Sequence, residues 1–516
     1  MKILFFARHS TYLRNFESVL RLLAERGHRV HIALERQESL GGREMLERLR
    51  AEYPGITAGQ APHRKDGWFK LATRLRLGLD YLRYLEPAYA TAPRLESRAR
   101  ERTPRFVLAL TRSLAAGAAG RRLLARWIWR MEQSVPVSTE VADYIRGEAP
   151  DAVLITPLVG VVASDELDCL YGARALGIPT ALCVWSWDHL SSKALIRTVP
   201  DRVFVWNPTQ AEEARALHAV PATRIVVTGA QCFDQWFDRG PSRSRAEFCR
   251  RVGLPDDRPF LLWVCSSLFR GSPPEAGFVV RWVRALRGSA DAALRDAHVL
   301  IRPHPQRLAE WQHVPLQDLG PGVAFWGGNP VDAGSRADYF DSLHHSAAVA
   351  GLNTSAFVEG AIAGRPIYAV LPPEYHDNQE GTIHFHYLLT VAGGLLHASR
   401  TLEEHAAQLA AALRGEIPDP ERSRRFVEAF VRPQGLTRPS TPLFVDAVEA
   451  LPGVARVPET RVATRLSRFE VRVLRRLLRT NAGRRWLDSP RDAGGGKHAK
   501  DDARRAARLQ GAGAAR

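Results

Sequence analysis

The chain has 516 residues, of which 45% are hydrophobic and 25% charged, and its formal net charge is +17. Because one hydrophobic core rarely organises more than about 300 residues, this length predicts two domains. The composition excludes a disordered or fibrous protein, and no apolar run reaches the roughly 20 residues of a transmembrane helix. The five cysteines form no C-x-x-C pair and the apolar start is too short for a signal peptide, so we expect free thiols in a cytoplasmic protein.

The positive charge is concentrated in two segments. Residues 64–130 contain 16 Lys and Arg against 5 Asp and Glu, and residues 456–516 contain 17 against 6, so each carries a net charge of +11. Segregated basic segments are typical of proteins that bind nucleic acid or an anionic membrane. Because no nucleic-acid-binding motif accompanies them, we expect the anionic membrane surface, and no nucleic acid, as a partner.

The first half follows the pattern of a doubly wound α/β domain. A strand at residues 3–7, a helix that ends at Gly27 and a strand at residues 30–34 form its first βα unit. No G-x-G-x-x-G sequence follows the first strand, so no tight dinucleotide site is predicted there. The pattern continues through predicted strands 151–155, 180–184, 202–206 and 224–228 and predicted helices 166–176 and 209–217. We expect this Rossmann-like domain to cover residues 1–237.

Residues 64–130 interrupt that pattern with a basic helical segment. Its last helix places Trp127 and Trp129 among arginines. Such a helix can lie in a membrane interface with its indole rings at headgroup depth, or it can pack on the domain and expose a solvated charged face. The basic C-terminal segment favours the first alternative. We therefore predict that both Trp side chains contact the membrane and that the protein is peripheral on the inner face of the plasma membrane.

A second α/β series follows a charged linker and capping helix at residues 238–258. Its predicted strands are 260–265, 298–302, 323–325, 347–351 and 366–370, and its predicted helices are 277–286, 355–363 and 402–414. We expect this second Rossmann-like domain to cover residues 238–455. Residues 456–516 are predicted to form a basic helix, at 461–478, and a disordered tail.

Two consecutive domains of this kind bring the carboxyl ends of both sheets to a cleft, where ligands bind. Ser266 and Ser267 follow a strand of the second domain and can offer hydroxyl and amide groups to a phosphate, although a plain turn is the simpler explanation. Arg302 and His304 follow another strand, and proline stands on both sides of the His. An Arg beside a His fits a site from which a phosphorylated leaving group departs.

A third strand of the second domain ends in Asn353, Thr354 and Ser355, where a helix begins. Free N–H groups and the positive end of the dipole make such a helix start an anion site, whereas simple capping is the alternative. Glu359 lies four residues after Ser355 on the same helical face. It is therefore a candidate for accepting hydrogen bonds from a ribose.

The first domain offers a candidate catalytic loop. Two Trp residues after one of its strands are followed by Asp188, His189 and a Lys, and either Asp188 or His189 is a candidate base for an acceptor hydroxyl. Asp165 and Glu166 are alternatives, although helix capping also explains them. The His- and Asp-containing segment 376–386 matches no standard metal-ligand spacing, so we predict no metal and no cofactor.

Several of these motifs together resemble a known group of enzymes. They are R-P-H-P at 302–305, N-T-S at 353–355, E-G-A-I-A-G-R-P at 359–366 and W-S-W-D-H-L-S-S-K at 185–193. The second half resembles the donor-binding domain of GT-B-fold transferases, which have two Rossmann-like domains facing a cleft. The resemblance is to the CDP-glycerol glycerophosphotransferases and the capsular-polysaccharide Kdo transferases, and it covers roughly residues 150–400.

This resemblance implies a metal-independent transferase of bacterial surface polysaccharide biosynthesis. The first domain would bind a lipid-linked or membrane-held acceptor, and the second a nucleotide-activated donor. Arg302 and His304 would meet the donor diphosphate, residues 353–355 its phosphates and Glu359 its nucleoside. The chain lacks the W-H-G-T sequence of the teichoic-acid polymerases, so a nucleotide sugar is at least as good a donor as CDP-glycerol. A nucleotide-sugar epimerase of the same architecture and a non-enzymatic RNA-binding protein are the alternatives.

Overall fold

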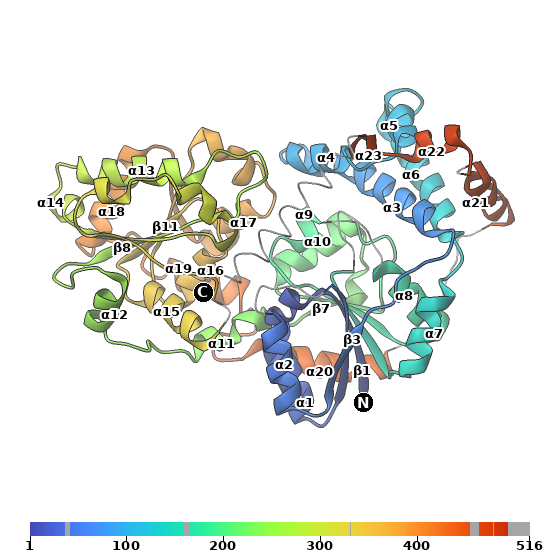
Figure 1. Cartoon of the computed structure of the whole chain (residues 1–516), viewed down its shortest axis with the longest axis horizontal. Helices are drawn as coiled ribbons and strands as arrows, with labels where there is room; N and C mark the ends of the chain where they lie inside the picture. Colours follow the sequence, from blue (N-terminus) through green and yellow to red (C-terminus); the bar gives the residue numbers. More distant parts are fainter. Residues whose placement is uncertain are drawn as a thin grey trace. The chain divides into compact units, whose positions relative to one another are not determined.

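A computed structural model describes residues 1–36, 42–158, 166–193, 195–330, 332–454, 464–477 and 479–493 of the chain (Figure 1). The chain divides into two compact units. The first contains residues 1–232 and the described residues from 440 onward, and the second contains residues 233–439. Each unit is built on one parallel sheet with helices on both faces, which confirms the predicted α/β class.

The sheet of the first unit has the strand order β3-β2-β1-β4-β5-β6-β7. Its strands are β1 (Lys2–His9), β2 (Arg29–Arg36), β3 (Ile56–Gln60), β4 (Ala152–Thr156), β5 (Thr180–Cys183), β6 (Arg202–Val205) and β7 (Ile225–Val227). Its helices are α1 (Glu17–Glu25), α2 (Gly42–Glu52), α3 (Phe69–Tyr84), α4 (Pro93–Arg100), α5 (Arg105–Arg112), α6 (Ala118–Gln133), α7 (Thr139–Glu148), α8 (Glu166–Ala175), α9 (His189–Ser192), α10 (Pro208–His218), α20 (Ser440–Glu449), α21 (Arg465–Leu477), α22 (Asn481–Leu487) and α23 (Pro490–Ala493).

The sheet of the second unit has the order β10-β9-β8-β11-β12-β13. Its strands are β8 (Phe260–Val264), β9 (His298–Arg302), β10 (Val323–Phe325), β11 (Ala348–Gly351), β12 (Ile367–Val370) and β13 (Leu396–Ser399). Its helices are α11 (Asp234–Phe237), α12 (Arg245–Val252), α13 (Glu275–Arg287), α14 (Ala292–Arg295), α15 (Ala333–His344), α16 (Ala356–Ile362), α17 (Phe385–Thr390), α18 (Leu402–Leu413) and α19 (Arg422–Phe430).

The central strands are buried on both faces, and this made them recognisable from the sequence. In β1, Ile3 and Phe5 join one apolar layer while Leu4 and Phe6 join the other. Parallel strands covered by helices on both sides have nearly continuous apolar sequences. The two strands that the sequence analysis missed, β3 and β13, are edge strands. Their sequences I-T-A-G-Q and L-H-A-S have no such run.

The units differ from the expected domain ranges at both ends of the second domain. The second unit begins at residue 233 rather than 238, because α11 is tied to it by the buried ion pair between Asp234 and Arg432, with Oδ1 and Nη2 2.8 Å apart. It ends at residue 439 rather than 455. The chain then returns to the first unit, and the pattern of strands and helices alone gave no sign of that return.

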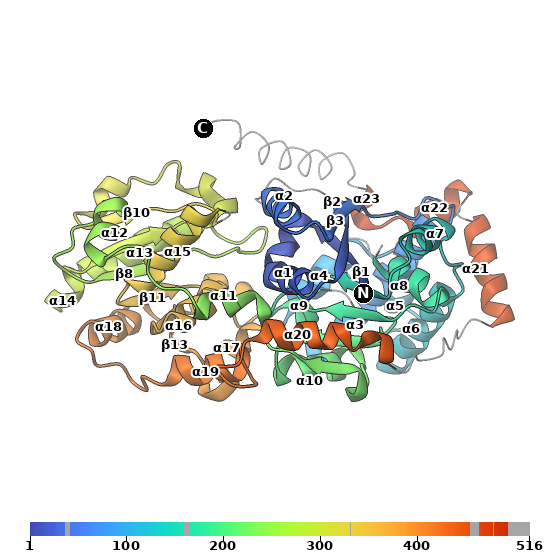
Figure 2. The ribbon, with the colours of Figure 1, turned by 90° about the horizontal axis from the view of Figure 1, so that it is seen from below.

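Helix α20 accounts for the return. Phe444, Val445 and Val448 join the apolar layer that α1 and α2 form on one face of the first sheet, and Figure 2 shows α20 running alongside α1. Its polar side also pairs with the first unit, since Glu449 accepts hydrogen bonds from Arg26 at 2.7 Å and lies 2.7 Å from Nε2 of His28. A C-terminal helix therefore completes the layer that the N-terminal helices begin.

The predicted basic segment 64–130 is helical, and it has an apolar core of its own. Leu75 of α3 and Ile128 of α6 lie in this core, to which α21 and α22 contribute Val471 and Leu487. The helix predicted at 461–478 is thus present as α21. Helix α22 was not predicted, and α23 lies within the stretch from Ser489 onward that was predicted to be disordered. Residues 494–516 of the predicted tail lie outside the described residues. We refer to helices α3 to α6 with α21 and α22 as the helical subassembly.

A buried ion-pair network joins this helical subassembly to the sheet. Arg76 of α3 is 2% exposed, and its Nε donates to Glu132 of α6 at 2.9 Å. Its Nη1 and Nη2 donate to the two carboxylate oxygens of Asp168 in α8 at 2.9 and 3.0 Å. Burial lowers the pKa of the Arg76 guanidinium, but the charges of Asp168 and Glu132 outweigh it and raise that pKa. Tyr171 donates a further hydrogen bond to Glu132 at 2.8 Å.

We predict that Arg76→Met lowers the free energy of unfolding of the first unit by about 3–5 kcal/mol, because it leaves two buried carboxylates without their cation. Arg126→Met is the matched control, since Arg126 is exposed on α6. Urea unfolding followed by tryptophan fluorescence measures both variants. Equal stability of the two variants would contradict a structural role for the network.

Candidate functional site

The strand order of the second unit creates one topological switch point. Strands β8 and β11 are neighbours in the sheet, while the chain runs outward from β8 to β9 and β10 on one side and from β11 to β12 and β13 on the other. Open parallel sheets bind ligands at the carboxyl ends of the strands beside such a point. Most of the residues predicted to bind a donor lie there, after β8, β9 and β11.

Arg302, the last residue of β9, is a buried cation with unused hydrogen-bonding capacity. Its side chain is 4% exposed, and its Nη1 has no hydrogen-bond partner among the described residues. Its Nη2 donates only a long bond of 3.5 Å to the Gly328 carbonyl, and the guanidinium lies 4.9 Å from the ring centre of Tyr339. Burial lowers the pKa of Arg302. Such a group favours an anionic ligand that supplies the missing acceptors.

The backbone beside Arg302 makes room for the guanidinium. Gly327 has a φ of +112°, and a Cβ at this position would lie 2.5 Å from Cζ of Arg302. Any other residue would displace the cation, so glycine is required here both for the backbone conformation and for the close approach.

His304 is held as a neutral imidazole. It precedes a 3₁₀ helix at Pro305–Trp311, and its Nδ1 accepts a hydrogen bond from the Gln306 amide at 3.3 Å. The proton of the neutral ring therefore lies on Nε2, which is the nitrogen available to donate. Burial, followed by the positive charge of Arg307, lowers the pKa of His304 to about 4.

Ser266 has a structural role that the sequence did not reveal. It is buried, its amide donates to Glu275 at 2.7 Å, and its Oγ accepts from the amide of Asn353 at 3.1 Å. It thereby joins the ends of β8 and β11 across the switch point. Burial raises the pKa of Glu275 to about 8 even though Trp263 also donates to it. Ser267 is exposed and offers its hydroxyl to solvent.

The start of α16 offers fewer donors than the sequence predicted. The amides of Phe357 and Val358 donate to the carbonyls of Thr354 and Ser355 at 3.2 and 3.0 Å, and the Ala356 amide donates to the Thr354 hydroxyl at 3.3 Å. Ser355 is exposed and its side chain makes no capping bond. The helix is also only seven residues long, so its dipole is small.

Glu359 lies on α16 beside Tyr339 of α15, and the Tyr339 hydroxyl donates to its carboxylate. Burial, followed by the charge of Glu359, raises the pKa of Tyr339 well above its usual value. Because the guanidinium of Arg302 faces the ring of Tyr339, the three side chains form one contiguous group. Sequence reasoning missed Tyr339, since a single tyrosine in a helix carries no local signal.

The candidate base lies in the first unit, after β5. Asp188 accepts hydrogen bonds from Ser186 at 2.6 Å and Ser192 at 3.1 Å, and it pairs with Lys193 at 2.9 Å. About a quarter of its side chain is exposed. His189, in contrast, is 1% exposed, and burial lowers its pKa to about 3. Because the His189 ring is buried and the Asp188 carboxylate is accessible, the geometry favours Asp188.

The helical subassembly holds this loop by its backbone. Arg83 of α3 donates to the carbonyls of Leu190 and Lys193 at 2.7 and 3.3 Å, and Arg98 of α4 donates to the carbonyl of Ser192. The basic segment predicted to face a membrane therefore uses part of its charge to position the loop of Asp188.

The end of β1 lies at the same carboxyl edge of the first sheet as the loop that carries Asp188. Sequence reasoning did not include it in the site. Arg8 follows the apolar run directly and forms a paired contact with Glu166, with Nε to Oε1 at 2.6 Å and Nη2 to Oε2 at 2.7 Å. This contact disfavours Glu166 as a base, and Asp165 lies outside the described residues. Tyr12 packs against Trp185 with their ring centres 4.4 Å apart. The change from an apolar run to a charged residue at Arg8 was the sequence signal that could have indicated this part of the site.

The predicted membrane contacts Trp127 and Trp129 are both half-buried. They pack against the apolar core of the helical subassembly. No helix in the described ranges is long and apolar enough to cross a bilayer. Nor do three or more His, Cys, Asp or Glu side chains gather into a potential metal site within those ranges.

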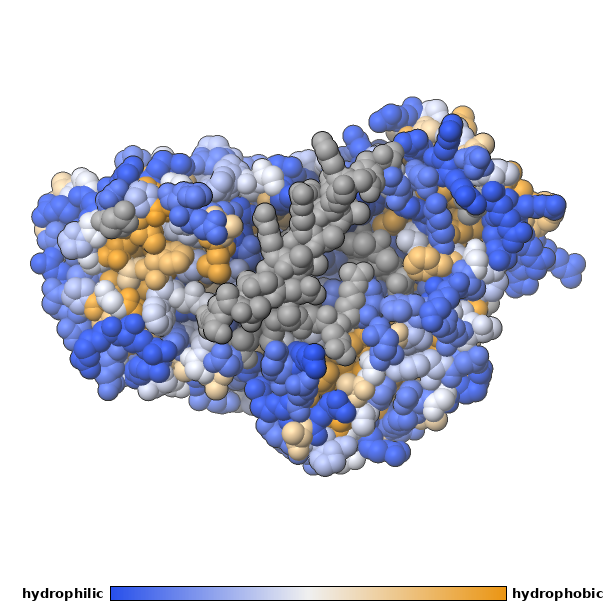
Figure 3. All heavy atoms as spheres, viewed as in Figure 1, coloured by the Kyte–Doolittle hydropathy of each residue, from blue (hydrophilic) through white to orange (hydrophobic). Residues whose placement is uncertain are grey.

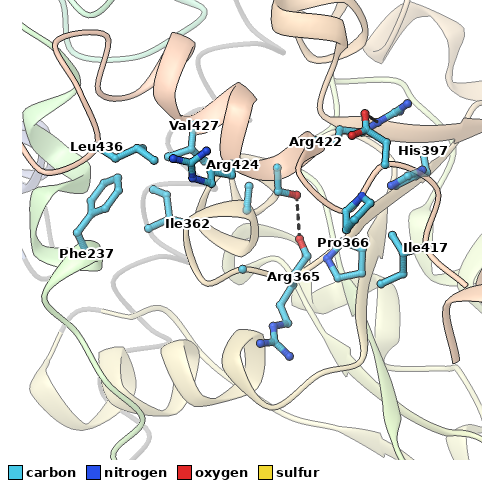
Figure 4. A pocket seen from close by; sticks show the side chains of 15 residues that line it. Phe237, Ile362, Arg365, Pro366, His397, Ile417, Arg422, Arg424, Val427 and Leu436 are labelled. Atoms are coloured by element: carbon cyan, nitrogen blue, oxygen red, sulfur yellow. Dashed lines mark hydrogen bonds and ion pairs between the residues drawn. The ribbon is translucent and has the colours of Figure 1, made fainter. Parts of the chain in front are cut away.

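A cavity of about 340 Å³ in the second unit has none of the predicted site residues in its lining. Its lining includes Arg365 and Pro366, which directly precede β12, so it opens at the amino edge of the sheet. Figure 4 shows Phe237 and Leu436 at one end and His397 at the other.

No family model and no curated protein matches the sequence. Among solved structures, the chain is similar to a Listeria monocytogenes protein assigned provisionally as a UDP-N-acetylglucosamine 2-epimerase (12% identity, 89% of this chain and 98% of that chain, TM-score 0.50). It is similar to the MnaA–UDP complex of S. aureus (11% identity, 88% and 97%, TM-score 0.51). A glycosyltransferase from Rickettsia africae ESF-5 aligns at 11% identity over 88% and 98% of the two chains, with a TM-score of 0.49.

The first two similarities, together with the two parallel sheets, define the fold as GT-B-like. This agrees with the fold expected from the motifs at 302–305 and 353–366. Membership of the CDP-glycerol glycerophosphotransferase or Kdo transferase group stays a prediction, because no family model matches.

We predict that the imidazole of His304 titrates with a midpoint near pH 4 rather than near the usual 6.5, because burial and Arg307 disfavour its charged form. As the pH falls, the unfolded chain binds this proton before the folded chain does. The group therefore lowers the free energy of unfolding progressively as the pH falls from about 6.5 to about 4. Two-dimensional ¹⁵N NMR of the ring nitrogens, assigned by comparison with His304→Gln, measures the midpoint. A midpoint above pH 6 would contradict the buried, neutral donor.

Proposed function

We propose that the second unit binds a nucleotide-activated donor at the carboxyl edge of its sheet, beside the switch point. The observation that carries this proposal is the buried guanidinium of Arg302, whose Nη1 lacks a hydrogen-bond partner among the described residues. A diphosphate supplies both the opposite charge and the acceptors that such a group needs. His304 contributes its Nε2 proton as a neutral donor to the same diphosphate.

Residues at the same carboxyl edge of the sheet supply the remaining contacts to the donor. The exposed hydroxyls of Ser267 and Ser355 and the half-exposed Thr354 are available to phosphate oxygens, while Asn353 and Ser266 hold the two strand ends in place. Glu359 accepts hydrogen bonds from the ribose, and Tyr339 fixes its carboxylate. Nucleotide binding thus rests on one cation and several neutral donors.

The reaction we propose is the transfer of a sugar, or of glycerol phosphate, from this donor to a membrane-held acceptor in surface polysaccharide biosynthesis. As the bond between the transferred group and the nucleotide breaks, negative charge grows on the leaving nucleotide. Arg302 and His304 stabilise that charge without a metal ion, a role typically worth several kcal/mol of barrier. The likeness of the motifs to the CDP-glycerol and Kdo transferases supports this reaction, and we place the protein at the inner face of the plasma membrane.

Asp188 is the base in this proposal. Its carboxylate is accessible and oriented by Ser186 and Ser192, whereas the neighbouring His189 is buried and only weakly basic. As the acceptor hydroxyl attacks the donor, its proton passes to Asp188. Lys193 lies 2.9 Å from the same carboxylate and helps to orient it.

A nucleotide-sugar epimerase is the second candidate function. The structure from Listeria monocytogenes, whose TM-score is 0.50, was assigned to that activity. An epimerase uses the same donor contacts but needs no acceptor. A non-enzymatic RNA-binding function has less support, because cations of the helical subassembly such as Arg76 are buried and paired.

We predict that CDP, UDP, GDP or CMP raises the melting temperature of the wild-type protein, and that Arg302→Met weakens the effective nucleotide by about 10- to 100-fold. His304→Ala and Glu359→Ala should act in the same direction. A thermal-shift titration measures all of them, with Arg284→Met, an exposed site on α13, as the control. A nucleotide that binds Arg302→Met as tightly as the wild type would refute the site.

We predict that Asp188→Asn lowers the transfer rate by about 10²- to 10⁴-fold and leaves the nucleotide-induced thermal shift unchanged, because the base does not contact the donor. Activity should also persist in EDTA. Incubating the nucleotide sugar alone and recording NMR spectra separates the two candidate functions. Appearance of the epimeric sugar without acceptor would identify an epimerase.

A further inference from the structure

Helix α21 presents two apolar faces, and among the described residues only one of them is packed against other helices. Ser467 and Val471 are buried, at 3% and 1% exposure, against the helical subassembly. A second stripe of apolar side chains follows at helical spacing on another face. It consists of Leu466, Phe469, Val473 and Leu477, which are 66%, 65%, 40% and 51% exposed.

Arginines border this exposed stripe. Arg465, Arg468, Arg472 and Arg476 are all exposed on α21, and the helix contains five arginines and a single acidic residue, Glu470. On a helix with about 100° per residue, these four arginines lie side by side along one edge of the stripe. The helix therefore combines a row of positive charge with a row of exposed apolar surface.

Exposed apolar side chains are concentrated in this part of the protein. Of the nine large hydrophobic side chains that are exposed among the described residues, seven belong to the helical subassembly and one, Leu114, lies in its α5–α6 loop. Besides the four of α21 they are Phe69, Leu114, Leu123 and Trp486, and the ninth is Leu308 of the second unit. In Figure 3, hydrophobic side chains stand among hydrophilic ones where Figure 1 labels α21 and α22. Single exposed hydrophobic residues are common, but four of them in a row on one face of α21 mark an interaction surface.

We propose that the exposed stripe of α21 docks on an anionic lipid bilayer, with its apolar side chains entering the interface and its arginines meeting the lipid phosphates. A helix with one strongly basic edge and an adjacent apolar face is the usual form of an interfacial membrane helix. A symmetric contact with a second copy fits less well, because it brings the net positive charges of two α21 helices together. In this proposal Phe469 and Leu477, which are more exposed than the half-buried Trp127 and Trp129, are the principal membrane contacts.

This proposal deepens the proposed function, since it names the surface that would bring the enzyme to a membrane-held acceptor. It is tested without nucleotide or acceptor, and so its failure is distinguishable from failure of the donor site. The full chain is sedimented with vesicles of phosphatidylcholine alone or mixed with phosphatidylglycerol.

The wild-type protein is expected to bind the mixed vesicles, to bind pure phosphatidylcholine more weakly, and to be released by high salt. The double variant Phe469→Ser with Leu477→Ser should bind about tenfold more weakly or worse. The double variant Arg468→Gln with Arg472→Gln should lose the preference for anionic vesicles. Leu308→Ser, with a side chain of similar exposure in the second unit, and Arg284→Gln are the matched controls and should bind as the wild type does.

Equal binding of both double variants and the wild type would overturn the proposal, as would equal binding of the wild type to neutral and anionic vesicles. Light scattering without lipid gives a further test. A dimer that the Phe469→Ser and Leu477→Ser changes dissociate would assign the stripe to a contact between copies instead. Circular dichroism verifies the fold, and the arginine variant, which alters only exposed side chains, keeps the test valid if the apolar variant misfolds.

Discussion

The guanidinium of Arg76 lies inside the first unit between the carboxylates of Glu132 and Asp168, and three helices depend on it. It joins α3 and α6 of the helical subassembly to α8, which covers the sheet. From α3, Arg83 then holds the backbone of the loop that carries Asp188. A buried ion pair adds little net stability over an apolar contact, but a missing partner is costly, so such a network specifies one arrangement of helices more than it stabilises it. The position of the candidate base is a consequence of that arrangement.

Arg302 in the second unit is also a buried cation, but its pairing differs from that of Arg76. Arg76 is fully paired within the chain, whereas Arg302 is buried with donor capacity left over and with a glycine, Gly327, making room for it. Burying a charge is unfavourable unless a partner compensates it. Where the described residues do not supply the partner, a ligand can, and the neutral His304 next to it adds a directional donor without adding to the positive charge. The proposed recognition of a diphosphate rests on this balance of charge.

The net charge of +17 consequently has two different uses in one molecule. In the segment 64–130, residues such as Arg64, Arg76 and Arg83 are buried and hold elements together. On α21, the arginines are exposed and stand beside apolar side chains. The net charge counts buried and exposed arginines alike. It therefore predicts an anionic partner but does not indicate which helix binds it. Burial separates the structural cations from those that remain for an external surface.

The sequence alone determined the α/β class, the two domains, the central strands and the edge at which Arg302, His304 and Asn353 gather, because these depend on local apolar runs and on the polar residues that end them. Only the tertiary structure decided the rest. The return of α20 to the first sheet, the edge strands β3 and β13, the pairing of Arg8 with Glu166 and the burial of His189 all depend on contacts between residues far apart in the chain. Local patterns carry no record of such contacts, since the free energy that fixes them comes from packing and desolvation, which exist only once the chain has folded.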